Sequence, residues 1–315
     1  DRRVGVRKFK NDPSLTPEEI AIIGTWVDAG APRGNPADMP PPRQFHPQDR
    51  WMIGTPDVVV AMPGPRRVRA RAPDEWLNIE VDSGVTEDRY IQAVEIKPAS
   101  GVRVIHHSTA ASFTDDDPAG QFLVEYAPGK GGDVFPEGTG RLLPAGSKLR
   151  INLHLHAIGQ EEQAHVEVGF KFYPKGVRPA NILHSVHIGD QENLDIPAGA
   201  DNVRSDGYSV MTKPVRLTAF QPHLHYRGKA QCMEAILPVS GYGRRDGGNI
   251  IPISCASRFR FGWHIAYLYE DDVQPLLPAG TVLHVVSWHD NSRAHRGNPD
   301  PTNWVGFGQR TTGLG

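Results

Sequence analysis

Short apolar runs separated by turn residues dominate this chain and restrict its class of fold. Thirty-three glycines and 28 prolines interrupt runs rich in Val, Ile, Leu and aromatic residues, a pattern typical of β-sandwiches and barrels. The sequence therefore predicts an all-β protein. Its clearest predicted strands are YIQAVEI (90–96), GVRVIHH (101–107), KLRINLHLH (148–156), HVEVGFKF (165–172), PVRLTAF (214–220) and RFRFGWHIAYLY (258–269).

A short internal repeat divides the β region into two similar halves. LLPAGSKLRINLHLH (142–156) and LLPAGTVLHVVSWHD (276–290) share a turn followed by a strand, in which Pro and Gly shape the turn and β-branched residues favour the strand. A length of 315 residues is sufficient for two domains with their own cores. We expect two sandwich domains, at 47–176 and 177–315, joined near 174–182.

The first 46 residues have a different pattern. LTPEEIAIIGTWVDAG (15–30) predicts one amphipathic helix, with Thr16 as N-cap, Pro17 at the first position, Glu19 completing a capping box and Gly30 at the end. A Pro-rich linker follows. The helix either packs on the first sandwich or belongs to a further domain.

Composition excludes several partners. The 34 basic and 36 acidic side chains nearly cancel, so the balance does not indicate nucleic acid or an anionic membrane surface. No run reaches the roughly 18 apolar residues needed to span a bilayer, and no leader-like segment opens the chain. Cys232 and Cys255 fit either one disulfide or two buried thiols.

Three histidine pairs carry the chemical signal. In a strand over 148–156, His154 and His156 would share a polar face, opposite an apolar face formed by Leu149, Ile151, Leu153 and Leu155. His223 and His225 would likewise share one face if HLH forms a strand. Imidazole suits copper, zinc, iron and nickel, so the pairs predict a transition-metal protein without naming the metal.

The adjacent pair His106-His107 can bind one metal ion only if the local backbone departs from a regular strand. Neighbouring side chains in a regular strand point to opposite faces, so both can bind one ion only if the strand bends, bulges or ends there. Each pair alone can be incidental in a β protein. Of the other histidines, we expect His284 to be packed or hydrogen-bonded and His289 to be solvated.

The order of motifs resembles a known family. HH, then HxHxxG after a PAG turn, then PHxHxxGK, then DNSxxxxxNPDP is similar to the copper type II, ascorbate-dependent monooxygenases, especially their bacterial members, over roughly residues 50–312. The resemblance implies two tandem jelly-roll-like antiparallel β-sandwich domains, each holding one copper ion. By the same resemblance, His106, His107 and His154 bind the first copper, His223 and His225 bind the second, and His156 supports a ligand or is incidental.

The resemblance also implies a reaction. The copper at His223 and His225 would hydroxylate a C–H bond of a small organic substrate with dioxygen, and the first copper would deliver an electron from an external donor, either an ascorbate-like reductant or a c-type cytochrome. Such enzymes are periplasmic or secreted. The helix at 15–30 is similar to the last helix of small c-type cytochrome domains that precede some of these enzymes, although no CxxCH occurs here.

Two departures from the family pattern matter. A methionine ligand expected for the second copper would lie just beyond Gly315 or be replaced, and Gln221 stands where peptide-amidating members carry an arginine, which makes a glycine-extended peptide a poor substrate. The main alternative is a copper-binding or electron-transfer protein without oxygenase chemistry. A zinc hydrolase or a purely structural sandwich is a third interpretation, but no general base is obvious beside the histidines.

Overall fold

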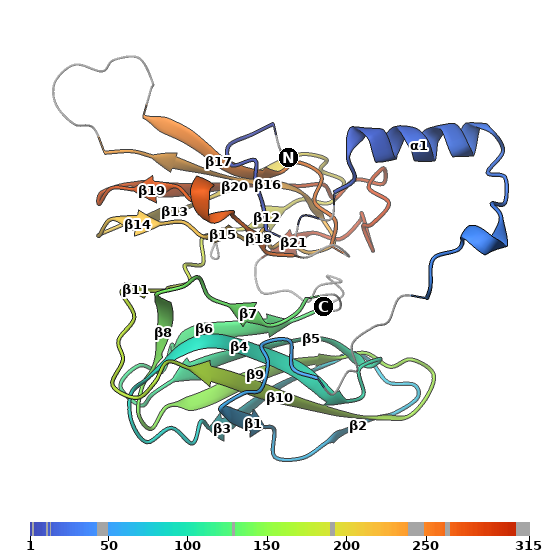
Figure 1. Ribbon diagram of the computed structural model, residues 1–315. Helices are drawn as coiled ribbons and strands as arrows, with labels where there is room; N and C mark the ends of the chain where they lie inside the picture. The colour runs from blue at the N-terminus through green and yellow to red at the C-terminus, as the bar shows by residue number, and fades with distance from the viewer. Residues whose placement is uncertain are drawn as a thin grey trace. The chain divides into compact units, whose positions relative to one another are not determined.

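The structure, a computed structural model, is built mainly of antiparallel β-strands with one short α-helix near the N-terminus (Figure 1). It describes residues 1, 3–10, 12, 14–42, 50–127, 130–189, 193–238, 249–261 and 265–306. The predicted all-β, sandwich-type class with a short N-terminal helix is confirmed. Among the described residues, none of the helices has the length and apolar character to cross a membrane.

The chain divides into two compact units. One contains residues 40–185, and the other combines residues 186–315 with residues 1–39. The first ten residues join the second unit through backbone hydrogen bonds from Val6 to the Ile253 carbonyl, 2.8 Å, and from Lys10 to the Leu268 carbonyl, 2.8 Å. The sequence-based division, by contrast, set residues 1–46 apart, since local pattern carries no signal of this long-range pairing.

The unit at 40–185 contains two sheets. The larger has the order β1-β10-β4-β8-β11, with β2 paired to β10 and β7 to β4, and the smaller has the order β3-β9-β5-β6. The β8–β11 pair is parallel, a departure from the purely antiparallel sandwich that the sequence predicted. The strands are β1 (Val58–Ala61), β2 (Arg66–Val68), β3 (Glu75–Asp82), β4 (Arg89–Ser100), β5 (Ile105–Phe113), β6 (Gln121–Tyr126), β7 (Asp133–Val134), β8 (Thr139–Leu143), β9 (Lys148–Leu155), β10 (Glu162–Phe172) and β11 (Asn181–Ile182).

The core of this unit follows the predicted period of two. In β9 the side chains of Leu149, Ile151, Leu153 and Leu155 are at most 1% exposed and belong to one apolar cluster, which also contains residues of β4, β5, β6 and β10. Burial of each such side chain stabilises the fold by about 1.5–3 kcal/mol. The apolar face of β9 therefore fixes which face of the strand is left for its polar residues.

The second unit has one four-stranded sheet, β13-β20-β16-β17, and three small pairs, β12-β21, β14-β19 and β15-β18. A disulfide joins Cys232 to Cys255, which face each other on β16 and β17. Of the two alternatives left open by the sequence, the bridge is the one formed. The strands are β12 (Asp195–Ile196), β13 (Val203–Val210), β14 (Val215–Arg216), β15 (Ala219–Phe220), β16 (Gly228–Ile236), β17 (Ile250–Ala256), β18 (Tyr267–Leu268), β19 (Leu276–Leu277), β20 (Val282–His289) and β21 (Val305–Gly306).

Two predicted strands of this unit differ from the structure. The run 214–220 forms two short strands, β14 and β15, that pair with different partners. Within the described part of 258–269, only Tyr267–Leu268 is a strand. Phe259 and Tyr269 are nevertheless buried, at 8% and 0% exposed. The strand prediction is therefore wrong for most of the described run, although these two aromatic side chains are buried.

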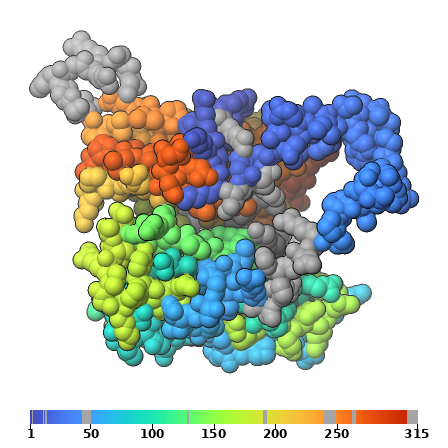
Figure 2. Space-filling model, viewed as in Figure 1, coloured from blue at the N-terminus to red at the C-terminus, as the bar shows by residue number. Residues whose placement is uncertain are grey.

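The N-terminal helix α1 (Pro17–Asp28) begins as predicted. Thr16 is the N-cap, its side chain accepts from the Glu19 amide, and the Glu19 carboxylate accepts from the Thr16 amide. This is the reciprocal arrangement of a capping box. None of the helix residues is buried, and Figure 2 shows the helix, in blue, on the surface. In the described part of the chain, the remaining helical elements are two short 3-10 turns, η1 (Pro36–Asp38) and η2 (Asp271–Val273).

Candidate metal centres

The first candidate centre joins the ends of two neighbouring strands. His106 and His107 lie at the start of β5, and His154 lies near the end of β9, with which β5 pairs. The register between the two strands shifts between Ile105 and His107. This β-bulge is the departure from a regular strand that His106 and His107 require, because an extra residue lets two consecutive side chains turn toward one side. The strand itself starts at Ile105 and not at the predicted 101, because the preceding residues form a turn in which the Val104 and Ile105 amides donate to the Gly101 carbonyl.

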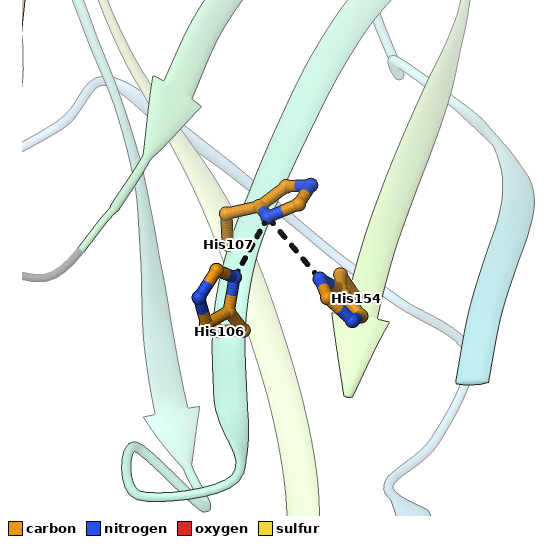
Figure 3. A group of neighbouring side chains, drawn as sticks. All are labelled: His106, His107 and His154. Atoms are coloured by element: carbon orange, nitrogen blue, oxygen red, sulfur yellow. Dashed lines mark hydrogen bonds between the residues drawn. The ribbon is translucent and has the colours of Figure 1, made fainter. Parts of the chain in front are cut away.

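The ring nitrogens of these three histidines converge. Nδ1 of His107 lies 3.1 Å from Nδ1 of His106 and 3.4 Å from Nδ1 of His154, and Figure 3 shows the His107 nitrogen between the other two rings. His106 is exposed, His107 half-buried and His154 buried. Among the described residues, these three form the one group in which at least three potential metal-binding atoms lie within 4.8 Å of one another.

The spacing of these nitrogens suits a transition-metal ion. Two imidazole nitrogens bound tetrahedrally at about 2.0–2.1 Å lie about 3.3 Å apart, close to the observed 3.1 and 3.4 Å. Three imidazoles with no carboxylate among them favour copper or zinc over magnesium or calcium, which prefer oxygen ligands. The residues present therefore fit a copper ion.

Electrostatics at this centre favour neutral rings. Burial lowers the pKa of His106, and the nearby His154 lowers it further. Burial also lowers the pKa of His154, although Asp74 opposes this effect. A neutral imidazole keeps a lone pair, which a metal ligand needs.

Two residues beside the trio were missed by sequence reasoning. The Asp74 carboxylate lies 3.0 Å from Nε2 of His154 and 2.7 Å from Nδ1 of His156. The Trp76 ring stacks on His154 at a centroid distance of 4.2 Å and an interplanar angle of 14°. Neither had a local signal, since the β3–β9 register brings Trp76 opposite His154, and Asp74 directly precedes β3. His156 thus contacts the same carboxylate as His154 and lies outside the converging trio.

The second candidate centre contains His223 and His225. Their Nε2 atoms lie 3.4 Å apart and both residues are exposed. The predicted strand is wrong here, because the two residues lie in an irregular segment between β15 and β16. The rings nevertheless converge at a spacing that suits one ion. Leu224 between them is buried, so the two imidazoles are left toward solvent.

Specific contacts shape this irregular segment. The His223 amide donates to Oε1 of Gln231 at 2.9 Å, and the Gly228 amide donates to the His225 carbonyl at 2.8 Å. A Cβ placed on Gly228 would lie 2.4 Å from the Leu224 Cβ and 2.9 Å from the Phe259 ring. Only glycine therefore allows this turn to close beneath the histidines.

The DNSxxxxxNPDP motif supports the same segment. Asn291 is fully buried, and its Oδ1 accepts from Nε of Arg227 at 2.7 Å and from Nδ2 of Asn298 at 2.9 Å. Its Nδ2 donates to the carbonyls of Pro197, 2.9 Å, and Asn303, 2.8 Å. Because Arg227 follows His225 by two residues, the motif anchors the chain beside the second histidine pair.

The predictions for two further histidines, His284 and His289, differ in outcome. His284 is buried, with its ring nitrogens 2.7 Å from Glu234 and 2.6 Å from Asp206, so the expectation of a hydrogen-bonded histidine is confirmed. His289 was expected to be solvated, which is wrong. It is 6% exposed, and this burial lowers its pKa.

Comparisons with known proteins add little to this geometry. No protein-family model matches the chain, and no curated protein matches it. Among solved structures, it is similar to one described as "Structure of allantoicase", with 10% identity and a TM-score of 0.21 over 72% of this chain and 80% of that chain. A similarity at this level bears on neither family nor reaction.

Proposed function

We propose that this protein is a copper-dependent monooxygenase that hydroxylates a C–H bond of a small organic substrate with dioxygen and an external electron donor. The observation that carries the proposal is the convergence of both histidine sets singled out by the family resemblance. Three Nδ1 atoms meet at His106, His107 and His154, and two Nε2 atoms meet at His223 and His225.

Each histidine set has a distinct role in this proposal. Copper, which cycles between Cu(I) and Cu(II), supplies one-electron redox chemistry when bound. The buried His154 and its two partners hold the ion that stores an electron. We assign the catalytic role to His223 and His225, as the family resemblance implies, and both are exposed, so that substrate and dioxygen could reach an ion held there.

The electron donor and compartment belong to the same proposal. An ascorbate-like reductant or a c-type cytochrome would supply electrons, as the family resemblance implies. The Cys232–Cys255 disulfide supports a periplasmic or secreted location, because disulfides persist in oxidising compartments.

One observation favours a second candidate function. Among the described residues, the second centre offers two converging imidazoles where the first offers three. A copper-binding or electron-transfer protein without oxygenase chemistry would not need to bind dioxygen or substrate at the second centre. The two candidates differ in whether oxygen consumption yields a hydroxylated product.

The test compares metal content and turnover in the full chain. After copper loading, the unsubstituted protein should hold two copper ions and consume oxygen with ascorbate, coupled to product formation in a screen of small organic compounds. His223→Ala should hold one copper ion and lose turnover. His184→Ala, which changes an exposed histidine outside both sets, should match the unsubstituted protein in both measurements.

Three results would contradict the proposal in different ways. Two bound copper ions without substrate-coupled oxygen consumption would favour the electron-transfer alternative. Tight binding of zinc in preference to copper would favour a zinc protein. Loss of both copper ions from His223→Ala would show that the two histidine sets do not form separate centres.

A further inference from the structure

We propose that Asp74 is a positioning residue of the first metal centre, which holds the far nitrogen of His154 so that the near nitrogen faces the ion, and that His156 braces Asp74 in turn. This inference rests on metal binding at His106, His107 and His154, the centre of the proposed function. It does not require oxygenase activity.

The contacts of His154 indicate which of its ring nitrogens carries the proton and which keeps the lone pair. Nε2 lies 3.0 Å from Oδ2 of Asp74, and Nδ1 lies 3.4 Å from Nδ1 of His107. A neutral imidazole has one N–H and one lone pair, and a carboxylate oxygen accepts. The proton therefore belongs on Nε2, where it is donated to Asp74, and the lone pair remains on Nδ1, which points to the other two histidines.

The Asp74 carboxylate is itself held on its other oxygen. Oδ1 lies 2.7 Å from Nδ1 of His156, whose side chain is 61% exposed. With one oxygen engaged by each histidine, the carboxylate has little freedom to rotate away from His154. The second histidine of the His154-Leu155-His156 sequence therefore has a role although it lies outside the converging trio: it holds Asp74 in place.

The ring plane of His154 is restrained as well. Trp76, the residue opposite His154 across the β3–β9 pair, stacks on the imidazole at 4.2 Å. A stacked ring resists tilting, while the Asp74 hydrogen bond resists rotation within the ring plane. Together the two contacts fix both degrees of freedom that determine where the Nδ1 lone pair points.

The contacts of Asp74 indicate a role at the metal centre in addition to a contribution to stability. It lies just before β3, its side chain is 35% exposed, and its side-chain hydrogen bonds within the described residues go to the two histidines. Its bond to the exposed His156 contributes about 0–1 kcal/mol to stability, and its charge-assisted hydrogen bond to the buried, neutral His154 contributes about 1.5–3 kcal/mol. Loss of a carboxylate that orients a metal-bound histidine, in addition, commonly weakens metal binding about 10–100-fold.

The experiment isolates the first centre in the full chain by placing His223→Ala and His225→Ala in the background. Copper affinity is measured by competition with a chelator, and the ligand field is measured from the Cu(II) electron paramagnetic resonance spectrum. Asp74→Ala should weaken copper binding about 10–100-fold and change the copper hyperfine coupling, while the metal-free protein stays folded, as its melting curve will show.

Two further substitutions separate orientation from charge and from general stability. Asp74→Asn keeps an oxygen that can accept from His154, so it should restore the spectrum and most of the affinity. Asp82→Ala removes an exposed carboxylate from the same strand, far from the histidines in the β3–β9 register, and should change neither measurement.

The outcomes distinguish this inference from the proposed function. If Asp74→Ala binds copper like its parent, or if Asp82→Ala loses affinity equally, the positioning role is wrong. If the parent rejects copper but binds Co(II), the monooxygenase proposal fails, and the same variants are compared by their Co(II) absorption bands. If the parent binds neither ion, both inferences are overturned.

Discussion

Asn291 offers a sharp test of how the second histidine pair is supported. Its amide makes four side-chain hydrogen bonds in a fully buried position, two accepted and two donated. One of them comes from the guanidinium of Arg227, which is itself 4% exposed. Asn291→Ala removes all four at once and leaves a buried positive charge without this partner.

The expected cost follows from these bonds. A hydrogen bond to a charged group contributes about 1.5–3 kcal/mol and a neutral one about 0.5–1.5 kcal/mol. Asn291→Ala should therefore destabilise the unit by about 3–7.5 kcal/mol, a large share of the typical 5–15 kcal/mol of a folded protein. The variant should also bind copper more weakly at His223 and His225, because Arg227 anchors the segment that carries them.

Hydrogen exchange of backbone amides in β16 and β20 measures this loss within the affected unit. A destabilisation of 3 kcal/mol raises exchange through global opening by about 100-fold, whereas exchange in β4 and β10 of the other unit should stay unchanged. Asn202→Ala is a matched control, since it removes one exposed hydrogen bond from Lys229, 3.0 Å. We expect it to cost about 0.5 kcal/mol or less.

A second substitution at the same position tests the direction of the bonds. Asn291→Asp can still accept from Arg227 and Asn298, but a carboxylate cannot donate to the carbonyls of Pro197 and Asn303. It should therefore be destabilised as well, despite its improved charge pairing with Arg227. If Asn291→Ala loses less than about 1 kcal/mol, or if Asn291→Asp is as stable as the unsubstituted protein, the reasoning from satisfied hydrogen bonds is refuted.

The remaining predictions concern the same unit. Burial raises the pKa of Tyr269 to about 12, against a weaker opposing effect of its hydrogen bond to Ser254. Because the unfolded tyrosine ionises near 10 and the folded one does not, stability should fall by up to about 2.7 kcal/mol between pH 10 and 12. Tyr269→Phe should lose this slope in urea unfolding, and a slope equal to that of the unsubstituted protein would contradict the assignment. Reduction of the Cys232–Cys255 bridge, which spans 23 residues of sequence, should destabilise the unit by about 3 kcal/mol. The fall in melting temperature on adding a thiol checks this, and a Cys232→Ser, Cys255→Ser protein should not respond to the thiol.

Alternation along β9 shows what local pattern predicts well. The four apolar residues on one face are buried as expected, and His154 lies on the other face with Asn152 and Arg150. The same reasoning failed for the segment around His223 and His225, which is not a strand. Alternation identifies which side chains will be buried, but a strand also needs a neighbour with which to pair.

The sequence by itself determined the all-β class and the capped helix, because these depend on residue type and on spacing within a few residues, whereas the five histidines that converge in two sets were singled out by the family resemblance. Tertiary structure alone decided the bulge at His106-His107, the placement of Asp74 beside His154, and the contact between Asn291 and Arg227. Each of these depends on strand register or on a hydrogen bond between distant segments. Such pairings are selected by the free energy of the whole folded chain, and so no local pattern specifies them.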